Sequence, residues 1–221
     1  MTAGVGLGAV FVTGAVCVAA LLAGFVVSRL PEPDDGADKI RYADLVTPRF
    51  VTGSALTAGA AAAISWLTMP LPVQPMWWVL ATVGVVLAAV DVRTTWLPLR
   101  LTRLAWTGLA VGGLFTLVLG AGWAALLRAG AGAGLAGLLY LLVWRLSRGG
   151  FGFGDVRFAP LLGAATAAHS WSLLLLGLFA GSLLGAAYGG LRLLRRRPGP
   201  FPYAPAMLAG AYLACGISAT G

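Results

Sequence analysis

Long apolar stretches dominate the hydrophobic pattern of this chain from one end to the other. They are continuous, as in Trp77–Val90 and Leu173–Leu191, and do not alternate with a period of two residues. A membrane-spanning helix needs about 20 apolar residues, whereas the strands of a membrane barrel alternate. The pattern predicts an all-α polytopic membrane protein, a bundle of about eight transmembrane helices. The expected helices cover residues 3–27, 50–68, 76–92, 101–119, 123–145, 156–168, 171–191 and 203–220.

Composition agrees with this class. Hydrophobic residues make up 59% of the chain and charged residues only 10%, and the mean hydropathy is +0.90. A soluble domain would carry roughly 25% charged residues. We expect one membrane-embedded domain over residues 1–221, with a short cytoplasmic loop at 29–49. The first apolar segment has no basic residue ahead of it and is longer than the apolar part of a secretory signal, so we expect a retained helix.

The basic residues predict the orientation, because Lys and Arg favour the cytoplasmic ends of membrane helices. With the 29–49 loop in the cytoplasm, 14 of the 15 basic residues lie on that side, and only Arg128 lies outside. Both termini are then expected on the outer side. The net charge of +8 follows from this bias and from attraction to anionic lipid head groups in the bilayer. No nucleic-acid partner is expected, since the chain has no soluble basic face.

Two carboxylates are the candidate chemical groups. Of seven acidic residues, only Asp91 and Asp155 lie beyond residue 44, each at the edge of an apolar stretch. Burying an ionisable group in or near hydrocarbon is costly, so such residues are by default functional candidates. In the predicted topology Asp91 ends a helix that runs inward and Asp155 begins one that runs outward, which places both at the cytoplasmic edge. A shared site is therefore allowed.

A pair of carboxylates suits hydrolysis of a peptide bond. One takes a proton from the attacking water while the other, protonated, polarises the carbonyl. Two neighbouring carboxylates do not easily both ionise. A helix N-terminus favours Asp155 as the anion and a helix C-terminus disfavours Asp91. Our hypothesis from the helix ends is therefore that Asp91 holds the proton in a coupled titration.

Simpler interpretations exist for each aspartate. Asp155 fits an N-cap of the sixth helix, and Asp91 fits a charge at the membrane edge that pairs with Arg93 or Arg100. Neither interpretation explains the other motif. A membrane transporter that uses the two aspartates as a proton or cation relay is the alternative function, although transporters usually place carboxylates nearer the membrane midplane and often show paired repeats.

Other reactive residues offer less. The acidic group in the 29–49 loop lies among prolines and glycine without a ligand period, so we predict a solvated loop and no metal site. His169, the sole histidine, is predicted on the outer side, away from both aspartates. Ser182 lies in Ala-Gly-Ser-Leu and not in the GxSG-type sequence of a rhomboid-like serine protease. We expect Cys17 and Cys215 to be small core residues, and no cofactor is implied. Four tryptophans are expected as membrane-interface anchors: Trp77, Trp78, Trp96 and Trp171.

Two local sequences carry a family resemblance. Residues 152–163 read Gly-Phe-Gly-Asp-Val-Arg-Phe-Ala-Pro-Leu-Leu-Gly and resemble the GxGD motif of the prepilin peptidases, the type IV leader peptidases. Residues 91–102 read Asp-Val-Arg-Thr-Thr-Trp-Leu-Pro-Leu-Arg-Leu-Thr and resemble the family's other aspartate motif, with Pro98 seven residues after the carboxylate. The stretch from Gly199 to Pro205 is similar to the entry into the family's last helix. The resemblance spans about residues 76–215.

The resemblance implies an intramembrane aspartyl endopeptidase. Such an enzyme removes the short basic leader of type IV pilin-like precursors at the cytoplasmic face of the cell membrane. Asp91 and Asp155 match the family's two catalytic aspartates, and the supporting motif residues are Gly152, Gly154, Arg157 and Pro98. Glycines beside Asp155 would let substrate backbone approach closely and would permit unusual dihedral angles.

The chain departs from the larger members of this family. Those members also methylate the new N-terminus and carry an extended cytoplasmic loop with paired cysteines. Here the 29–49 loop is short and has no cysteine, which excludes a CxxC zinc site. We therefore predict a peptidase without methyltransferase activity, similar to the compact peptidases of Flp or Tad-type pilins. The presenilin and signal-peptide peptidases have a tyrosine before the first aspartate, whereas this chain has Val90. The sequence leaves the oligomeric state open.

Overall fold

The computed structural model describes residues 2–31, 40–148, 151–196 and 201–219, and within these ranges the regular structure is entirely helical. Two helices include a π-helical stretch, Leu22–Val26 after α1 and Leu80–Gly84 between α4 and α5. Short 3-10 turns cover Val27–Arg29 and Leu71–Val73. The α-helices are α1 (Thr2–Leu21), α2 (Tyr42–Leu45), α3 (Pro48–Thr68), α4 (Gln74–Val79), α5 (Val85–Thr94), α6 (Leu99–Val118), α7 (Gly122–Leu146), α8 (Phe153–His169), α9 (Trp171–Leu194) and α10 (Ala204–Ser218).

Helices occupy all eight of the predicted ranges, which confirms the all-α class. Six helical segments of the described chain are long and apolar enough to cross a membrane: Gly4–Arg29, Pro48–Thr68, Leu71–Thr94, Leu99–Val118, Gly122–Leu146 and Trp171–Leu194. The other two, α8 and α10, have 17 and 15 residues. Eight membrane crossings and the outer position of the termini therefore stay predictions.

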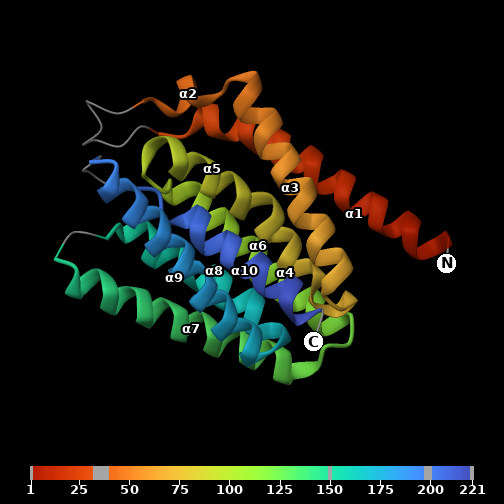
Figure 1. Ribbon diagram of the computed structural model, residues 1–221. Coiled ribbons are helices and arrows are strands. Elements are labelled where there is room, and N and C mark those ends of the chain that lie inside the picture. The colour runs from red at the N-terminus through yellow and green to blue at the C-terminus, as the bar shows by residue number, and fades with distance from the viewer. Residues whose placement is uncertain (1, 32–39, 149–150, 197–200, 220–221) are drawn as a thin grey trace.

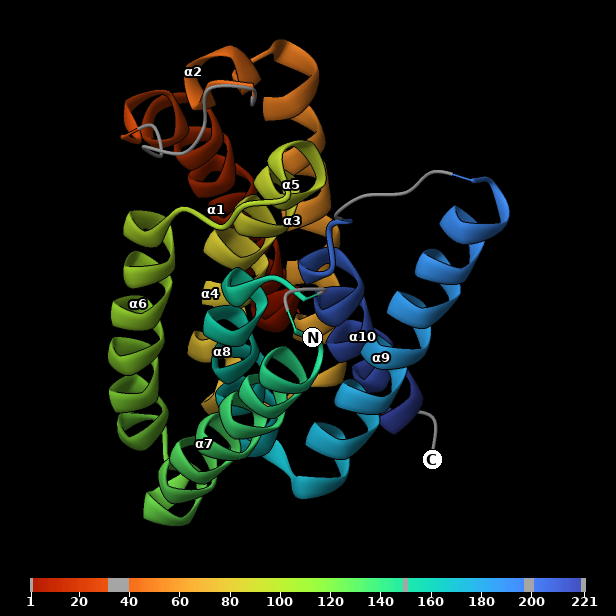
Figure 2. The same ribbon diagram turned by 90° about the vertical axis from the view of Figure 1, so that its left-hand side faces the viewer.

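The helices form one bundle with α8 and α10 in its middle, and α6 and α9 lie on opposite sides of it (Figure 2). α8 packs against α7 and α9, α10 packs against α9 and α5, and α1 packs against α3. Helix α8 is buried from Asp155 to Ala168 except at Arg157, because small residues let its neighbours close around it. The short helix α2 lies at one end of the bundle, and both chain ends lie toward the other (Figure 1).

Glycines set the closest contacts between helices. A Cβ atom on Gly132 of α7 would overlap the Gly163 carbonyl and the Ala167 side chain of α8. Gly181 of α9 and Gly210 of α10 meet in the same way, backbone against backbone. Such contacts are typical of helix packing in lipid, where dispersion rather than the hydrophobic effect drives association. They hold the helix that carries Asp155 tightly in the bundle.

Some single-residue expectations need correction. Trp77 is fully buried and packs edge-on against Tyr212, with ring centroids 5.4 Å apart, so it is a core residue and not an interface anchor. Cys215 is buried as expected, whereas Cys17 is exposed on the outside of the bundle. Arg128, the one basic residue predicted on the outer side, has partners within the bundle. Its guanidinium donates to the Ala167 and Ala168 carbonyls at 3.3 and 3.1 Å, which stabilises the C-terminus of α8.

The glycine contact between α7 and α8 can be tested by substitution. We expect Gly132→Leu to destabilise the protein by about 1–3 kcal/mol or more, because overpacking at a backbone contact forces the helices apart. Gly134→Leu is the matched control, since it lies on the same helix and its Cβ would meet nothing within 4 Å. Thermal unfolding of both variants in one detergent measures the difference, and equal midpoints would contradict this packing.

Candidate active site

Asp91 lies in the last turn of α5. The helix ends because Thr95 adopts a left-handed conformation with φ 56°, and the Thr95 amide donates to the Asp91 carbonyl at 2.8 Å. The chain then runs through Trp96 and Leu97 to Pro98, the N-cap of α6. Because proline disfavours a helical residue before it, this short connection stays non-helical beside the carboxylate.

Asp155 is the third residue of α8 and not its N-cap. The N-cap is Gly152, whose carbonyl accepts a hydrogen bond from the Asp155 amide at 3.2 Å. The capping interpretation of Asp155 is therefore wrong, because a cap must precede the first helical residue. Its side chain is left free for another role.

The structure brings the two carboxylates to one cavity of about 250 Å³ at the end of the bundle. Both are buried, Asp91 with 4% and Asp155 with 7% of its surface exposed. They are close enough to interact electrostatically. The cavity is lined by Asp91, Thr95, Trp96, Leu97, Gly152, Phe153, Gly154, Asp155 and Arg157. These residues come from the connection after α5 and from the start of α8, so the cavity is built by the two aspartate motifs.

The two carboxylates differ in their hydrogen bonds. Asp91 Oδ2 accepts the Ala204 amide at 3.1 Å, at the first turn of α10, and no ion pair with Arg93 or Arg100 is recorded in the described ranges. Asp155 Oδ1 is buried and has no hydrogen-bond partner in the same ranges. A helix N-terminus stabilises an anion, so α10 offsets the unfavourable end of α5. A buried oxygen without a donor instead favours the neutral acid.

The two glycines of the motif provide space rather than unusual dihedral angles. Gly152 has an ordinary φ of −72°, and Gly154 lies within α8, so the expectation of special backbone conformations is wrong. A Cβ on Gly154 would lie 3.1 Å from the Leu97 Cβ, and a Cβ on Gly152 would lie 3.0 Å from Asp155 Oδ2. Small residues therefore let the two motifs pack against each other.

The remaining predicted residues take different places. Arg157 is exposed, lines the cavity and lies over the Phe153 ring, 4.7 Å from its centroid. Pro98 is buried and is the N-cap of α6, and it is not among the residues that line the cavity. Trp96 does line the cavity, although the sequence favoured an interface anchor. The carboxyl groups among the residues that line the cavity are those of the two aspartates. Within the described ranges no three His, Cys, Asp or Glu side chains gather to hold a metal ion.

Comparison with known protein families gives a match, and it covers both motifs that build this cavity. A model described as the type IV leader peptidase family matches residues 78–190, slightly more than half of the chain and including both aspartates. The chain belongs to the type IV leader peptidase family. This confirms the family predicted from the motifs and makes the chain a peptidase, and its apolar helices make it a multi-pass membrane protein. Neither the curated proteins nor the solved structures contain a significant match.

Sequence reasoning missed part of this leader peptidase site. The Tyr203–Ala204 backbone reaches Asp91 across 113 positions of the chain. Tyr203 also packs against Phe151, with centroids 5.0 Å apart, and against Tyr140 at 6.1 Å. The similarity of residues 199–205 to the family's closing segment was the available signal, but a motif does not show which side chain it touches.

The different partners of the two aspartates predict different stability effects. We expect Asp91→Ala to destabilise this leader peptidase by about 1–3 kcal/mol more than Asp155→Ala, because it leaves the buried Ala204 amide without an acceptor. The two substitutions remove the same atoms and serve as controls for each other. Asp91→Asn keeps an acceptor and should lose less. Unfolding in detergent measures all three, and equal losses for the two alanine variants would contradict the assigned hydrogen bond.

Proposed function

We propose that the chain is an intramembrane aspartyl endopeptidase that cleaves the short basic leader of type IV pilin-like precursors at the cytoplasmic membrane face. The main support for this proposal is that two buried carboxylates, Asp91 and Asp155, line one cavity. No other acidic residue beyond position 44 exists to take either role. Family membership supports the peptidase chemistry, and the two carboxylates provide the general base and general acid that hydrolysis requires.

The cavity suits a water and a stretch of peptide backbone. Its volume of about 250 Å³ exceeds the roughly 30 Å³ that one water occupies in the liquid. In the proposed step one carboxylate takes a proton from the water, and the water oxygen forms a bond to the scissile carbonyl carbon. The other carboxyl group donates its proton to the carbonyl oxygen. As the tetrahedral intermediate collapses, the C–N bond breaks and the leaving amine takes the proton that the first carboxyl group holds. The second carboxylate takes back a proton from a hydroxyl group of the intermediate, which leaves a carboxylic acid and restores the pair.

The hydrogen bonds favour Asp91 as the base and Asp155 as the acid. The Ala204 amide at Asp91 Oδ2 stabilises a carboxylate there, whereas Asp155 Oδ1 has no donor among the residues that the structure describes. This reverses our hypothesis from the helix ends, in which Asp91 held the proton. The hypothesis considered only the dipole of the helix to which each aspartate belongs. The N-terminus of α10, which is far away in sequence, also acts on Asp91.

The position of the cavity fits a precursor with a basic leader and an apolar helix. Asp91 and Asp155 lie where α5 ends and α8 begins, at the bundle end for which the basic residues predict the cytoplasm. A substrate helix in the bilayer would bring the bond that precedes it to this level. Arg128, the one exception to the charge rule, binds helix carbonyls instead, so its outer position has a structural cause.

The short loop at 29–49 supports a peptidase without methyltransferase activity. It has no cysteine, and its described residues 40–49 include α2 and Asp44. The other acidic residues of the predicted solvated loop, Glu32, Asp34, Asp35 and Asp38, lie outside the described residues. On this basis we assign the chain to the compact Flp or Tad-type peptidases.

Cleavage of a precursor tests the two roles. We expect Asp91→Asn and Asp155→Asn each to lower kcat/KM for leader removal by about 10²–10⁴-fold, since an amide side chain does not transfer the proton. The assay incubates purified protein with a pilin-like precursor in detergent and separates the products by mass. Asp44→Asn, an acidic residue outside the cavity, is the control and should keep full activity.

A relay transporter would give the opposite result. An intact precursor with wild-type protein, together with a proton or cation flux in liposomes that either asparagine variant removes, would disprove the peptidase and support the transporter.

The coupled pair also predicts the pH dependence. We expect kcat/KM to rise with pH as the base loses its proton and to fall at higher pH as the acid loses its own, because the active form carries one proton on two carboxylates. Rates of precursor cleavage measured across the pH range in one detergent show the profile. A single ionisation would contradict the dyad.

A further inference from the structure

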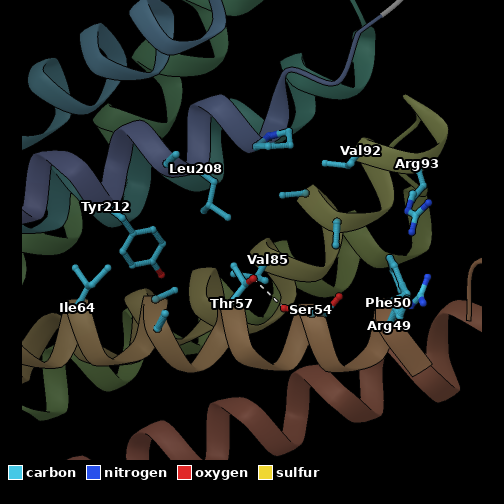
Figure 3. A pocket seen from close by; sticks show the side chains of 17 residues that line it. Arg49, Phe50, Ser54, Thr57, Ile64, Val85, Val92, Arg93, Leu208 and Tyr212 are labelled. Atoms are coloured by element: carbon cyan, nitrogen blue, oxygen red, sulfur yellow. Dashed lines mark hydrogen bonds between the residues drawn. The ribbon is translucent and has the colours of Figure 1, made fainter. Parts of the chain in front are cut away.

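A second, larger cavity of about 480 Å³ lies between α3, α5 and α10. Figure 3 shows Arg49 and Arg93 at one end of it and Ile64 and Tyr212 toward the other. It is separate from the aspartate cavity, and none of its lining residues lines that site. It opens to the outside of the bundle, where a membrane protein meets lipid.

The walls of this groove are apolar. Phe50, Val85 and Leu208 form its sides with small alanines between them. An open apolar groove in a bilayer does not stay empty, because hydrocarbon is the surrounding solvent. Its occupant is decided by shape and by the few polar groups that line it.

The groove is elongated. From Arg49 to Ile64 it follows about 22 Å of α3, at about 1.5 Å per residue. Its volume of about 480 Å³ is therefore spread along the helix, a shape that an extended acyl chain fills along its length.

The charged end of the groove favours an anion. Arg49 and Arg93 are both exposed and both line the cavity. No hydrogen bond or ion pair is recorded for either guanidinium in the described part of the chain. Guanidinium groups bind phosphate oxygens in a bidentate geometry. Arg49 and Arg93 lie at one end of the groove and the apolar lining extends away from them. A phospholipid has the same arrangement, with a phosphate at one end and acyl chains beyond it.

A buried hydroxyl group lies further along the same groove. Ser54 lines the cavity and is 3% exposed, and its Oγ has no hydrogen-bond partner among the described residues. Thr57, one turn further on, is by contrast satisfied by the Gly53 carbonyl at 2.8 Å (Figure 3). A buried polar atom without a partner is unfavourable, and an ester oxygen between a phosphate and an acyl chain would accept from it.

We propose that this groove binds one anionic phospholipid, with its phosphate between Arg49 and Arg93, an ester oxygen at Ser54, and one acyl chain along α3 toward Ile64. The site is independent of the proposed peptidase activity. It lies against the elements that hold the aspartate site, since Arg93 is two residues after Asp91 and Pro205 follows Ala204. A lipid here packs α3 against α5 and α10 from the membrane side.

Native mass spectrometry of the full-length protein in detergent tests the proposal, with phosphatidylglycerol and phosphatidylcholine as probes. We expect one phosphatidylglycerol to be retained in preference to phosphatidylcholine. The double variant Arg49→Gln, Arg93→Gln should bind it roughly 30-fold more weakly, the loss expected for two arginines at a lipid surface. Arg100→Gln, Arg103→Gln is the matched control, because these arginines lie on α6 outside the groove and should leave binding unchanged.

A second pair of variants tests the groove itself. Gly53 lines the cavity, and a Cβ there would meet nothing within 4 Å, so Gly53→Leu should fold normally and displace the acyl chain. Gly134→Leu, equally open but on α7, should keep the lipid. Equal retention of both lipids would overturn the proposal, as would equal losses in both arginine variants. Ala60 lines the groove, so a photoreactive residue at this position reports what lies there. A crosslink to the apolar helix of a precursor, together with no retained lipid, would assign the groove to that helix instead.

Discussion

The burial of two carboxyl groups in an apolar bundle is the constraint on which this structure depends. A charge in or near hydrocarbon is unfavourable by several kcal/mol unless protein groups replace its hydration. For Asp91 the replacement is the amide of Ala204 at the start of α10. Asp155 Oδ1 has no donor in the described ranges, which favours the neutral acid in the proposed mechanism. The two aspartates therefore differ in their hydrogen-bond partners and in the charge state that each favours. Acid–base catalysis requires such a difference, because one group must accept a proton and the other donate one.

That arrangement is possible only because the helices approach closely. Gly132 and Gly163 bring α7 and α8 into backbone contact, and Gly181 and Gly210 do the same for α9 and α10. The first contact fixes the helix that carries Asp155. The second fixes the helix whose N-terminus reaches Asp91. The glycine content of the chain therefore serves the site as well as the membrane bundle.

Helices α5 and α10 each serve two cavities. Near the end of α5, Asp91 lines the aspartate cavity, while Val92 and Arg93 line the larger groove between α3, α5 and α10. At the start of α10, Ala204 holds Asp91 and Pro205 lines the groove. Adjacent residues on a helix point in different directions, so the end of one helix contributes to two separate cavities.

The sequence alone determined the helical class and where the helical stretches lie, and it singled out two carboxylates at the edges of apolar runs, because both are local features of the chain. It also indicated the family through two motifs that the family match contains. Only the tertiary structure decided that Ala204 binds Asp91, that Asp155 is not a helix cap, that Trp77 is core, and that the motif glycines provide space. Each depends on contacts between segments far apart in sequence. Hydrophobic periodicity reports which face of a helix is apolar, but not which neighbour covers it.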